Sequence, residues 1–268
     1  MPAVAISSLQ ALNLQDLDLP VVYTKQLRRA DELTKAVVNS TYLGLDSAPM
    51  LDLVPEKIGL FLGTSFGPLE TNFRFLDSLL DDGEGQASPT LFSHSVHNAA
   101  AGYLARLFSI NGPAITISSY AWPFLAALEQ ASLMMCSGTI NRAIVVSGEM
   151  YSPLLEHAGK KLKEADYKFC QTGAVTWILD RVNERKLGNN IIINKIEMSY
   201  KPCDVTTFLT RTGEEWFFDN ESCKVTELLS YAFLLTRQIQ KKLTGDKKGE
   251  FNWSIKAPFG QAGLFLSC

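Results

Sequence analysis

The sequence has few histidines, no long apolar run and no excess of basic residues. It has three histidines among 268 residues, and all of them lie apart from the cysteines. Because a metal ion needs several ligands held together, we expect no metal site. There is no run of about 18 apolar residues, so we expect no membrane span. With 25 basic and 28 acidic residues the net charge is −3, which argues against a nucleic-acid partner.

The cysteines are odd in number and widely spaced. There are five, without a Cys-x-x-Cys pair: Cys136, Cys170, Cys203, Cys223 and Cys268. This usage is typical of reduced thiols, so we expect a cytoplasmic protein. The N-terminus has no basic start and therefore does not look like a signal peptide. Cys136 follows Met134 and Met135 and is expected to be buried.

Apolar runs that alternate with helical patterns are abundant. Hydrophobic residues make up 46% of the chain, enough for a large core. Apolar runs predict strands at 57–64, 114–119, 141–148, 173–180, 190–198, 251–255 and 263–267. Helical patterns occupy 68–80, 98–108, 123–138 and 225–245, and 203–222 is expected to be irregular. Strands that are apolar on both faces indicate a sheet covered on both sides, hence α/β layers.

The turn after the strand at 114–119 leads directly into a helix, an arrangement in which enzymes often place a nucleophile. Pro123 suits the first position of a helix, so strand passes into helix within a few residues. The free N–H groups at a helix N-terminus stabilise a thiolate or an oxyanion. Yet the turn holds Tyr120, Ala121 and Trp122, and a cysteine or serine nucleophile is missing from it.

Several segments occur in an order that identifies a family. They are KIGLFLGTSFGPLETNFRFL, SPTLFSHSVHNAAAGYLARLFSINGPAITIS, AIVVSGE and GAVTWILD, with FGQAGLFLS as a fainter match. Their order and spacing resemble the N-terminal half of β-ketoacyl synthases, the thiolase-fold condensing enzymes of fatty acid and polyketide synthesis. The resemblance covers 57–180. It implies a single thiolase-like domain over 1–268 with a layered α/β/α fold. Its ketosynthase-like N-terminal half spans 1–185 and its shortened C-terminal half 186–268.

The resemblance also identifies what has been lost. The family's nucleophilic cysteine falls on Ala121, and the glycine that follows it falls on Phe124. The bulk of Trp122 and Phe124 then indicates that the acyl canal is filled. Active members carry histidines in HGTGT-like and NHxFG-like motifs, but here no histidine follows His157. The resemblance therefore implies a subunit that performs no condensation and uses no cofactor.

Inactive members of this family are known as the chain length factors of type II polyketide systems. The chain is most similar to the shortened version found in aryl polyene systems. Such a subunit forms a heterodimer with an active β-ketoacyl synthase, and an acyl carrier protein is its indirect partner. The basic stretch 25–35 is either a carrier-protein contact or a solvated helix face. The resemblance implies a dimer strand made of Ala114, Ile115, Thr116, Ile117, Ser118, Ser119 and Tyr120.

A chain length factor also lines the tunnel that holds the growing product. The resemblance places this role on Phe66, Leu69 and Phe73, in addition to Trp122 and Phe124. The spacing i, i+3 and i+7 would place the first three on one helical face. An ordinary core helix has the same pattern, so both interpretations stay open.

Two other functions stay open as well. A malonyl decarboxylase that lacks the cysteine would need His94 or His97 to stabilise an enolate. Both histidines are more readily interpreted as structural or surface residues. A free-standing acyl-binding protein would form a homodimer. The thin C-terminal half is expected to leave apolar surface uncovered, as at a partner interface, so we expect the isolated chain to be poorly soluble.

Overall fold

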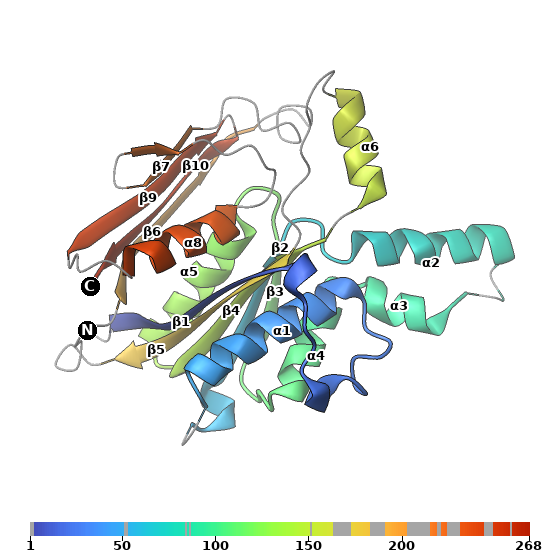
Figure 1. Cartoon of the computed structure of the whole chain (residues 1–268), viewed down its shortest axis with the longest axis horizontal. Coiled ribbons are helices and arrows are strands. Elements are labelled where there is room, and N and C mark those ends of the chain that lie inside the picture. The colour runs from blue at the N-terminus through green and yellow to red at the C-terminus, as the bar shows by residue number, and fades with distance from the viewer. Residues whose placement is uncertain are drawn as a thin grey trace.

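One mixed sheet, bent into two halves, organises the protein (Figure 1). The computed structural model describes residues 3–50, 53–83, 85, 87–150, 152–162, 173–182, 191–202, 215–218, 221–223, 231–243, 249–257 and 259–268. Cys170 and Cys203 lie outside these ranges. All statements about the fold concern the described residues.

The sheet contains the strands in the following spatial order. The first half consists of β3 (Ala114–Ser118), β2 (Ile58–Thr64), β4 (Arg142–Glu149), β5 (Gly173–Val182) and β1 (Ala3–Asn13). The second half continues with β6 (Ile191–Tyr200), β10 (Gly260–Ser267), β9 (Glu250–Ala257), β7 (Glu215–Phe218) and β8 (Glu221–Cys223). Strands β3, β2 and β4 are parallel, and the other pairings are antiparallel. The halves join through two residue pairs, Ala5 with Ile192 and Ile6 with Ile191.

The helices form two layers and a group beside the strand ends. Helices α1 (Glu32–Ser47) and α4 (Ala99–Leu107) cover the first half-sheet, whereas α5 (Pro123–Cys136) and α8 (Tyr231–Leu243) lie between the halves (Figure 1). The third group is α2 (Leu69–Asp82), α3 (Pro89–Ser95) and α6 (Pro153–Leu162). Short 3-10 turns occupy Leu14–Asp16, Val21–Tyr23 and Pro55–Lys57. No helix in the described ranges has both the length and the apolar character that a membrane span requires.

Two hydrophobic clusters fill the spaces between the layers. One joins the first half-sheet to α1 and α4 and includes Val37, Leu60, Leu104 and Ile144. The other joins α5 and α8 to both half-sheets and includes Leu125, Leu235, Trp177 and Leu264. Strands β2 and β4 are buried along their whole length, which is why consecutive positions in them are apolar. The predicted α/β layers are confirmed.

Three local expectations are wrong. Strands β7 and β8 lie within 203–223, most of which the sequence pattern marks as irregular. The pattern also misses β1, because a bulge between Ile6 and Ser8 breaks the alternation of buried and exposed positions. Cys136 is exposed rather than buried, since it is the last residue of α5 and faces away from the core.

The outer face of the second half-sheet is polar. Its outward positions on β6, β9 and β10 include Lys195, Glu197, Ser199, Asn252, Ser254, Lys256 and Gln261, and Lys195 is ion-paired with Glu197. Phe265 shares this face, with the Lys195 ammonium group 5.7 Å from its ring centre. Such alternation is typical of a sheet with one solvated face. The expectation of uncovered apolar surface is therefore wrong for this face. The exposed large apolar side chains lie mainly in the first half, among them Leu76, Leu80, Phe92, Tyr120 and Leu133.

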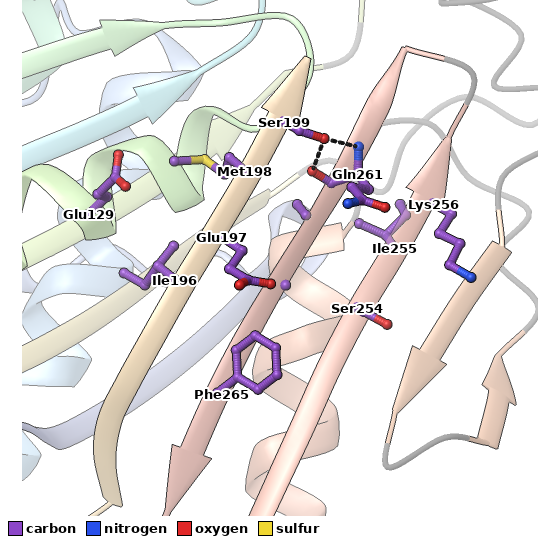
Figure 2. A pocket seen from close by; sticks show the side chains of 12 residues that line it. Glu129, Ile196, Glu197, Met198, Ser199, Ser254, Ile255, Lys256, Gln261 and Phe265 are labelled. Atoms are coloured by element: carbon purple, nitrogen blue, oxygen red, sulfur yellow. Dashed lines mark hydrogen bonds between the residues drawn. The ribbon is translucent and has the colours of Figure 1, made fainter. Parts of the chain in front are cut away.

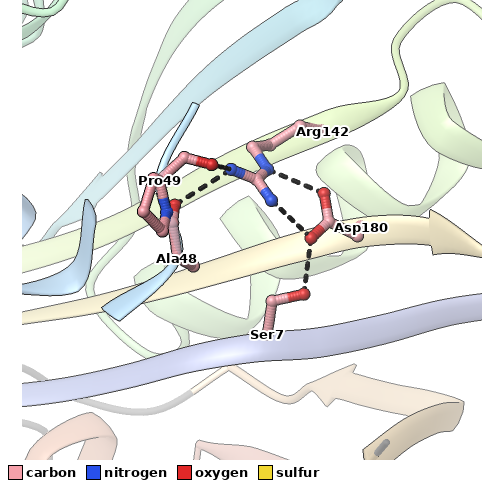
Figure 3. Close-up of polar contacts among 5 residues, drawn as sticks. All are labelled: Ser7, Ala48, Pro49, Arg142 and Asp180. Carbon is pink, nitrogen blue, oxygen red and sulfur yellow. Dashed lines mark hydrogen bonds and ion pairs between the residues drawn. The ribbon is translucent and has the colours of Figure 1, made fainter. Parts of the chain in front are cut away.

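A buried arginine fastens α1 to the sheet (Figure 3). Arg142, at the start of β4, donates from Nε and Nη2 to the two carboxylate oxygens of Asp180, at 2.7 and 2.6 Å. Its Nη1 donates to the carbonyl groups of Ala48 and Pro49 after α1, at 3.0 and 2.8 Å. Ser7 of β1 donates to Asp180 as well. The network thus ties three strands and a helix end to one charged pair.

We expect Arg142→Gln to lower the free energy of unfolding by about 3 kcal/mol, because it leaves the Asp180 carboxylate without its cation. Arg142 is 7% exposed, so water cannot replace the lost contacts fully. Lys160→Gln removes the exposed ion pair with Glu156 and should cost about 0.5 kcal/mol or less. Urea unfolding followed by circular dichroism compares the two. Equal losses would show that the Arg142 network contributes no more than a surface pair.

Gly63 in β2 lets α5 approach the sheet backbone to backbone. A Cβ at this position would lie 2.3 Å from the carbonyl oxygen of Pro123, so Gly63→Ala must push α5 away. We expect a loss of about 2 kcal/mol in stability. Gly102→Ala in α4 is the matched control, since a Cβ there meets nothing within 4 Å, and it should stabilise by about 0.5 kcal/mol. Thermal unfolding of both variants tests this, and an unaltered melting temperature for Gly63→Ala would contradict it.

Candidate functional site

The carboxyl ends of the parallel strands meet at one end of the first half-sheet. Strand β2 ends in Thr64, β3 in Ser118 and β4 in Glu149, and residues 119–122 lead from β3 into α5. The amide of Ser119 donates to the Thr64 carbonyl at 3.2 Å, which joins this turn to β2. In α/β sheets, ligand sites form outside the carboxyl ends of the strands. This region is therefore the candidate site.

The position of the expected nucleophile holds a buried methyl group. Ala121 is 7% exposed, and Trp122 and Phe124 are fully buried in the cluster between the half-sheets. All three residues that the resemblance relates to the family's nucleophile turn and acyl canal are thus buried. Their part in bounding an acyl tunnel stays a prediction.

The N–H groups at the start of α5 are occupied by a tyrosine. Pro123 has no N–H, and the amide of Ala126 donates to the carbonyl of Trp122, so Phe124 and Leu125 carry the free donors of the first turn. Both face the hydroxyl oxygen of Tyr231, at 2.7 and 3.4 Å. An acceptor from α8 therefore stands where a thiolate or an oxyanion would otherwise be stabilised.

Tyr231 is a site residue that sequence reasoning missed. It is 2% exposed and lies 107 positions along the chain from Phe124. No local pattern marks a residue that acts at such a distance, and the family motifs that the sequence matches well end at 180. Only the packing of α8 against α5 reveals it.

Aromatic rings fill the space behind the turn. The ring of Trp122 lies 5.9 Å from that of Tyr231 and 5.4 Å from that of Phe259. Tyr231 stacks on Trp253 at 6.0 Å, and Phe124 meets Trp177 edge to face at 5.0 Å. Edge-to-face and offset ring pairs add to the stabilisation that burial provides. The second half of the chain thus closes the site from behind with Tyr231, Trp253 and Phe259.

Phe66 lies in the turn between β2 and α2, outside the helix. Because α2 begins at Leu69, helical spacing relates only Leu69 to Phe73, and the shared face expected to include Phe66 is wrong. Phe66 is half-buried and its ring centre lies 5.9 Å from that of Tyr120. Leu69 and Phe73 are half-buried on α2. Their tunnel role stays a prediction.

Strand β3 forms an edge of the sheet. It pairs with β2 on one side, and among the described residues it has no strand partner on the other. Ala114 and Ser118 are exposed, Ile115, Thr116, Ile117 and Ser119 are half-buried, and Tyr120 is 64% exposed. An open edge is a template for a strand of another chain. The interface role of 114–120 stays a prediction.

Tyr200 lies close to this edge, at the end of β6. Burial raises the pKa of its hydroxyl, and the Glu129 carboxylate raises it further, whereas a hydrogen bond with Ser119 lowers it. The contact brings the second half of the chain to the end of β3.

His94 is placed as a structural residue, whereas His97 and His157 are exposed. His94 is buried, with Nδ1 2.7 Å from the Thr90 carbonyl and Nε2 2.9 Å from the Tyr103 hydroxyl. Both ring nitrogens of His94 are therefore engaged. His97 packs its ring against Gly67. Within the described ranges, no group of three or more His, Cys, Asp or Glu side chains is arranged to hold a metal ion.

A hollow of about 500 Å³ lies over β6, β9 and β10, away from the turn (Figure 2). Glu197, Ser254 and Phe265 line it on the sheet, and Glu129 lines it from α5. Its lining combines polar residues of the outer face with apolar ones, among them Ile196, Met198 and Ile255. None of the predicted site residues lines it, so it is not the candidate site.

The comparisons with known proteins agree on the fold. The family model described as β-ketoacyl synthase, N-terminal domain, matches residues 5–253. No curated protein matches the chain significantly.

Several solved structures are similar over most of the chain. One is a type II polyketide acyl carrier protein in complex with its ketosynthase bound to the hexaketide (12% identity, TM-score 0.74, 100% of both chains). Another is a ketosynthase in complex with its chain length factor from Xenorhabdus doucetiae (14% identity, TM-score 0.65, 99% of both chains). The ishigamide ketosynthase/chain length factor is similar over 74% of this chain and 67% of its own, at 19% identity and a TM-score of 0.59. These matches confirm the thiolase-like fold.

We expect Tyr231→Phe to cost about 1–2 kcal/mol, because it leaves the amides of Phe124 and Leu125 buried without their acceptor. The matched control is Tyr42→Phe on the partly exposed face of α1, which should change stability by less than about 0.5 kcal/mol. Urea unfolding of both variants gives the comparison. Indistinguishable midpoints would mean that the Tyr231 hydroxyl does not satisfy these amides.

Proposed function

Because the chain belongs to the β-ketoacyl synthase N-terminal domain family, we propose that it is a non-catalytic ketosynthase-like subunit. It pairs with an active β-ketoacyl synthase and bounds the length of the acyl or polyene chain that the partner builds. The proposal rests on the residues in the turn before α5 and on the hydrogen bonds at the start of this helix. The position of the family's nucleophile holds the methyl group of Ala121, and the adjacent helix amides face the Tyr231 hydroxyl.

The choice of a chain length factor is supported by the neighbours. A complex from Xenorhabdus doucetiae contains a ketosynthase and its chain length factor, and one of its chains is matched at 99% of its length. A chain in a complex of a type II polyketide carrier protein with its ketosynthase is matched over its whole length. We further propose, from the sequence resemblance, that the protein acts in type II polyketide synthesis of the aryl polyene kind, in the cytoplasm, with a carrier protein as indirect partner.

The partner ketosynthase would bind at the open edge of β3. Ala114, Ser118 and Tyr120 are exposed there, and Leu133 is exposed on α5. Exposed apolar side chains beside an open strand edge are costly in a monomer and favour a partner. Pairing of β3 with a strand of the ketosynthase would cover them.

The tunnel wall would be formed by Phe66, close to the same edge. Its half-buried ring touches Tyr120, so a partner that covers Tyr120 also meets Phe66. Leu69 and Phe73 continue this wall along α2, and Trp122 and Phe124 fill the space behind it. An aromatic, apolar slot suits a planar conjugated chain.

Co-expression with the ketosynthases of its host tests the proposal. We expect a one-to-one complex, poor yield of the chain alone, and longer products when Phe66→Ala removes the ring from the wall. Size-exclusion chromatography and mass spectrometry of the products give the two readouts. Phe265→Ala, a half-buried ring on the outer face of β10, should leave product length unchanged.

A clean homodimer that decarboxylates malonyl carrier protein would contradict this function. It would favour the enzyme with altered chemistry, although His94 already uses both ring nitrogens in hydrogen bonds.

A further inference from the structure

The turn that carries Phe66 is held by a buried carboxylate. Glu149, the last residue of β4, is 7% exposed and lies beside the end of β2. One carboxylate oxygen accepts from the amide of Ser65, and the other from the amide of Phe66 at 3.4 Å. The first oxygen also lies 3.1 Å from the Thr64 hydroxyl.

The same network reaches the next residue of the turn. The amide of Gly67 donates to the Thr64 hydroxyl oxygen at 2.9 Å, and that hydroxyl faces Glu149 and the Gly148 carbonyl. Gly67 has a φ of +57°, the left-handed conformation that turns the chain towards α2. Three successive amides, two directly and one through Thr64, therefore converge on one anion. Successive N–H groups arranged in this way form a concave anion site. Here the anion belongs to the protein itself.

Only a carboxylate fits this position well. It presents acceptors on both oxygens, whereas the side chain of glutamine has one acceptor and one NH₂ donor. With a glutamine in place of Glu149, an NH₂ group would face an amide hydrogen, and one of the two amides would lose its acceptor. Bonds from amides to a charged acceptor are also stronger than neutral ones.

We propose that Glu149 is a positioning residue that sets chain length through Phe66. Its carboxylate fixes the backbone of 64–67 and thereby fixes where the Phe66 ring stands against Tyr120 and the growing chain. The inference rests on the proposed function, because it needs Phe66 to bound a tunnel. It adds a residue that does not itself touch the tunnel and would be overlooked if only wall residues were mutated.

Two variants and a control test the inference in the complex with the ketosynthase. Glu149→Gln is nearly isosteric, and Thr64→Val removes only the hydroxyl that links Gly67 to the carboxylate. Glu197→Gln, an exposed glutamate paired with Lys195, is the control. For each variant, hydrogen exchange measured by mass spectrometry follows the amides of 64–67, and product analysis gives the length distribution. The yield and melting temperature of the complex are recorded in parallel.

We expect Glu149→Gln to speed exchange of these amides by about tenfold or more, as loss of their acceptor makes opening easier. Product lengths should broaden or shift in the direction seen with Phe66→Ala, while the complex still forms. Thr64→Val should act in the same direction more weakly, and Glu197→Gln should change neither readout. A merely structural role would lower yield and melting temperature without changing the length distribution.

Three results would overturn the inference. Unchanged exchange in Glu149→Gln would show that the carboxylate does not hold the turn. Faster exchange with normal product lengths, while Phe66→Ala shifts them, would show that the turn does not set length. If Phe66→Ala has no effect either, the proposed function itself fails, and the exchange data then show only what holds the turn.

Discussion

The close contact between α5 and β2 is the constraint on which the site depends. At Gly63 the strand has no side chain, and the carbonyl of Pro123 occupies the space that a Cβ would take. The first turn of α5 is thereby pressed against the centre of the first half-sheet. Trp122 and Phe124 are fully buried in the core between the half-sheets.

The second half of the chain completes this core from the other side. Tyr231 comes from α8, Trp253 from β9 and Phe259 from the turn before β10, and they pack against Trp122 or one another. The Tyr231 hydroxyl also satisfies the helix amides that an active centre of this type would leave for a reacting group. A helix N-terminus without an acceptor would be costly in such a dry core. Capping by Tyr231 therefore satisfies the first turn of α5 within the protein itself.

The α/β layers could be predicted because strands, helices and turns are each marked by residues close together in the sequence. The apolar runs of β2 and β4 follow from burial on both faces, and Gly and Pro mark the turns around β3 and α5. The pattern failed where local order is broken, as at the bulge in β1. It also failed at Cys136, where a helix end turns an apolar residue outwards. Phe66 was assigned to a helical face by spacing alone, although the helix begins only at Leu69.

Residue type and order along the chain were sufficient to establish the α/β layers and the family. Packing in three dimensions was needed to establish that Tyr231 caps α5, that Glu149 holds the Phe66 turn and that the outer face of the second half-sheet is polar. The first two contacts join residues 107 and 83 positions apart. Such contacts depend on how separate layers pack against one another. The spacing of residues within one helix or strand carries no information about this packing.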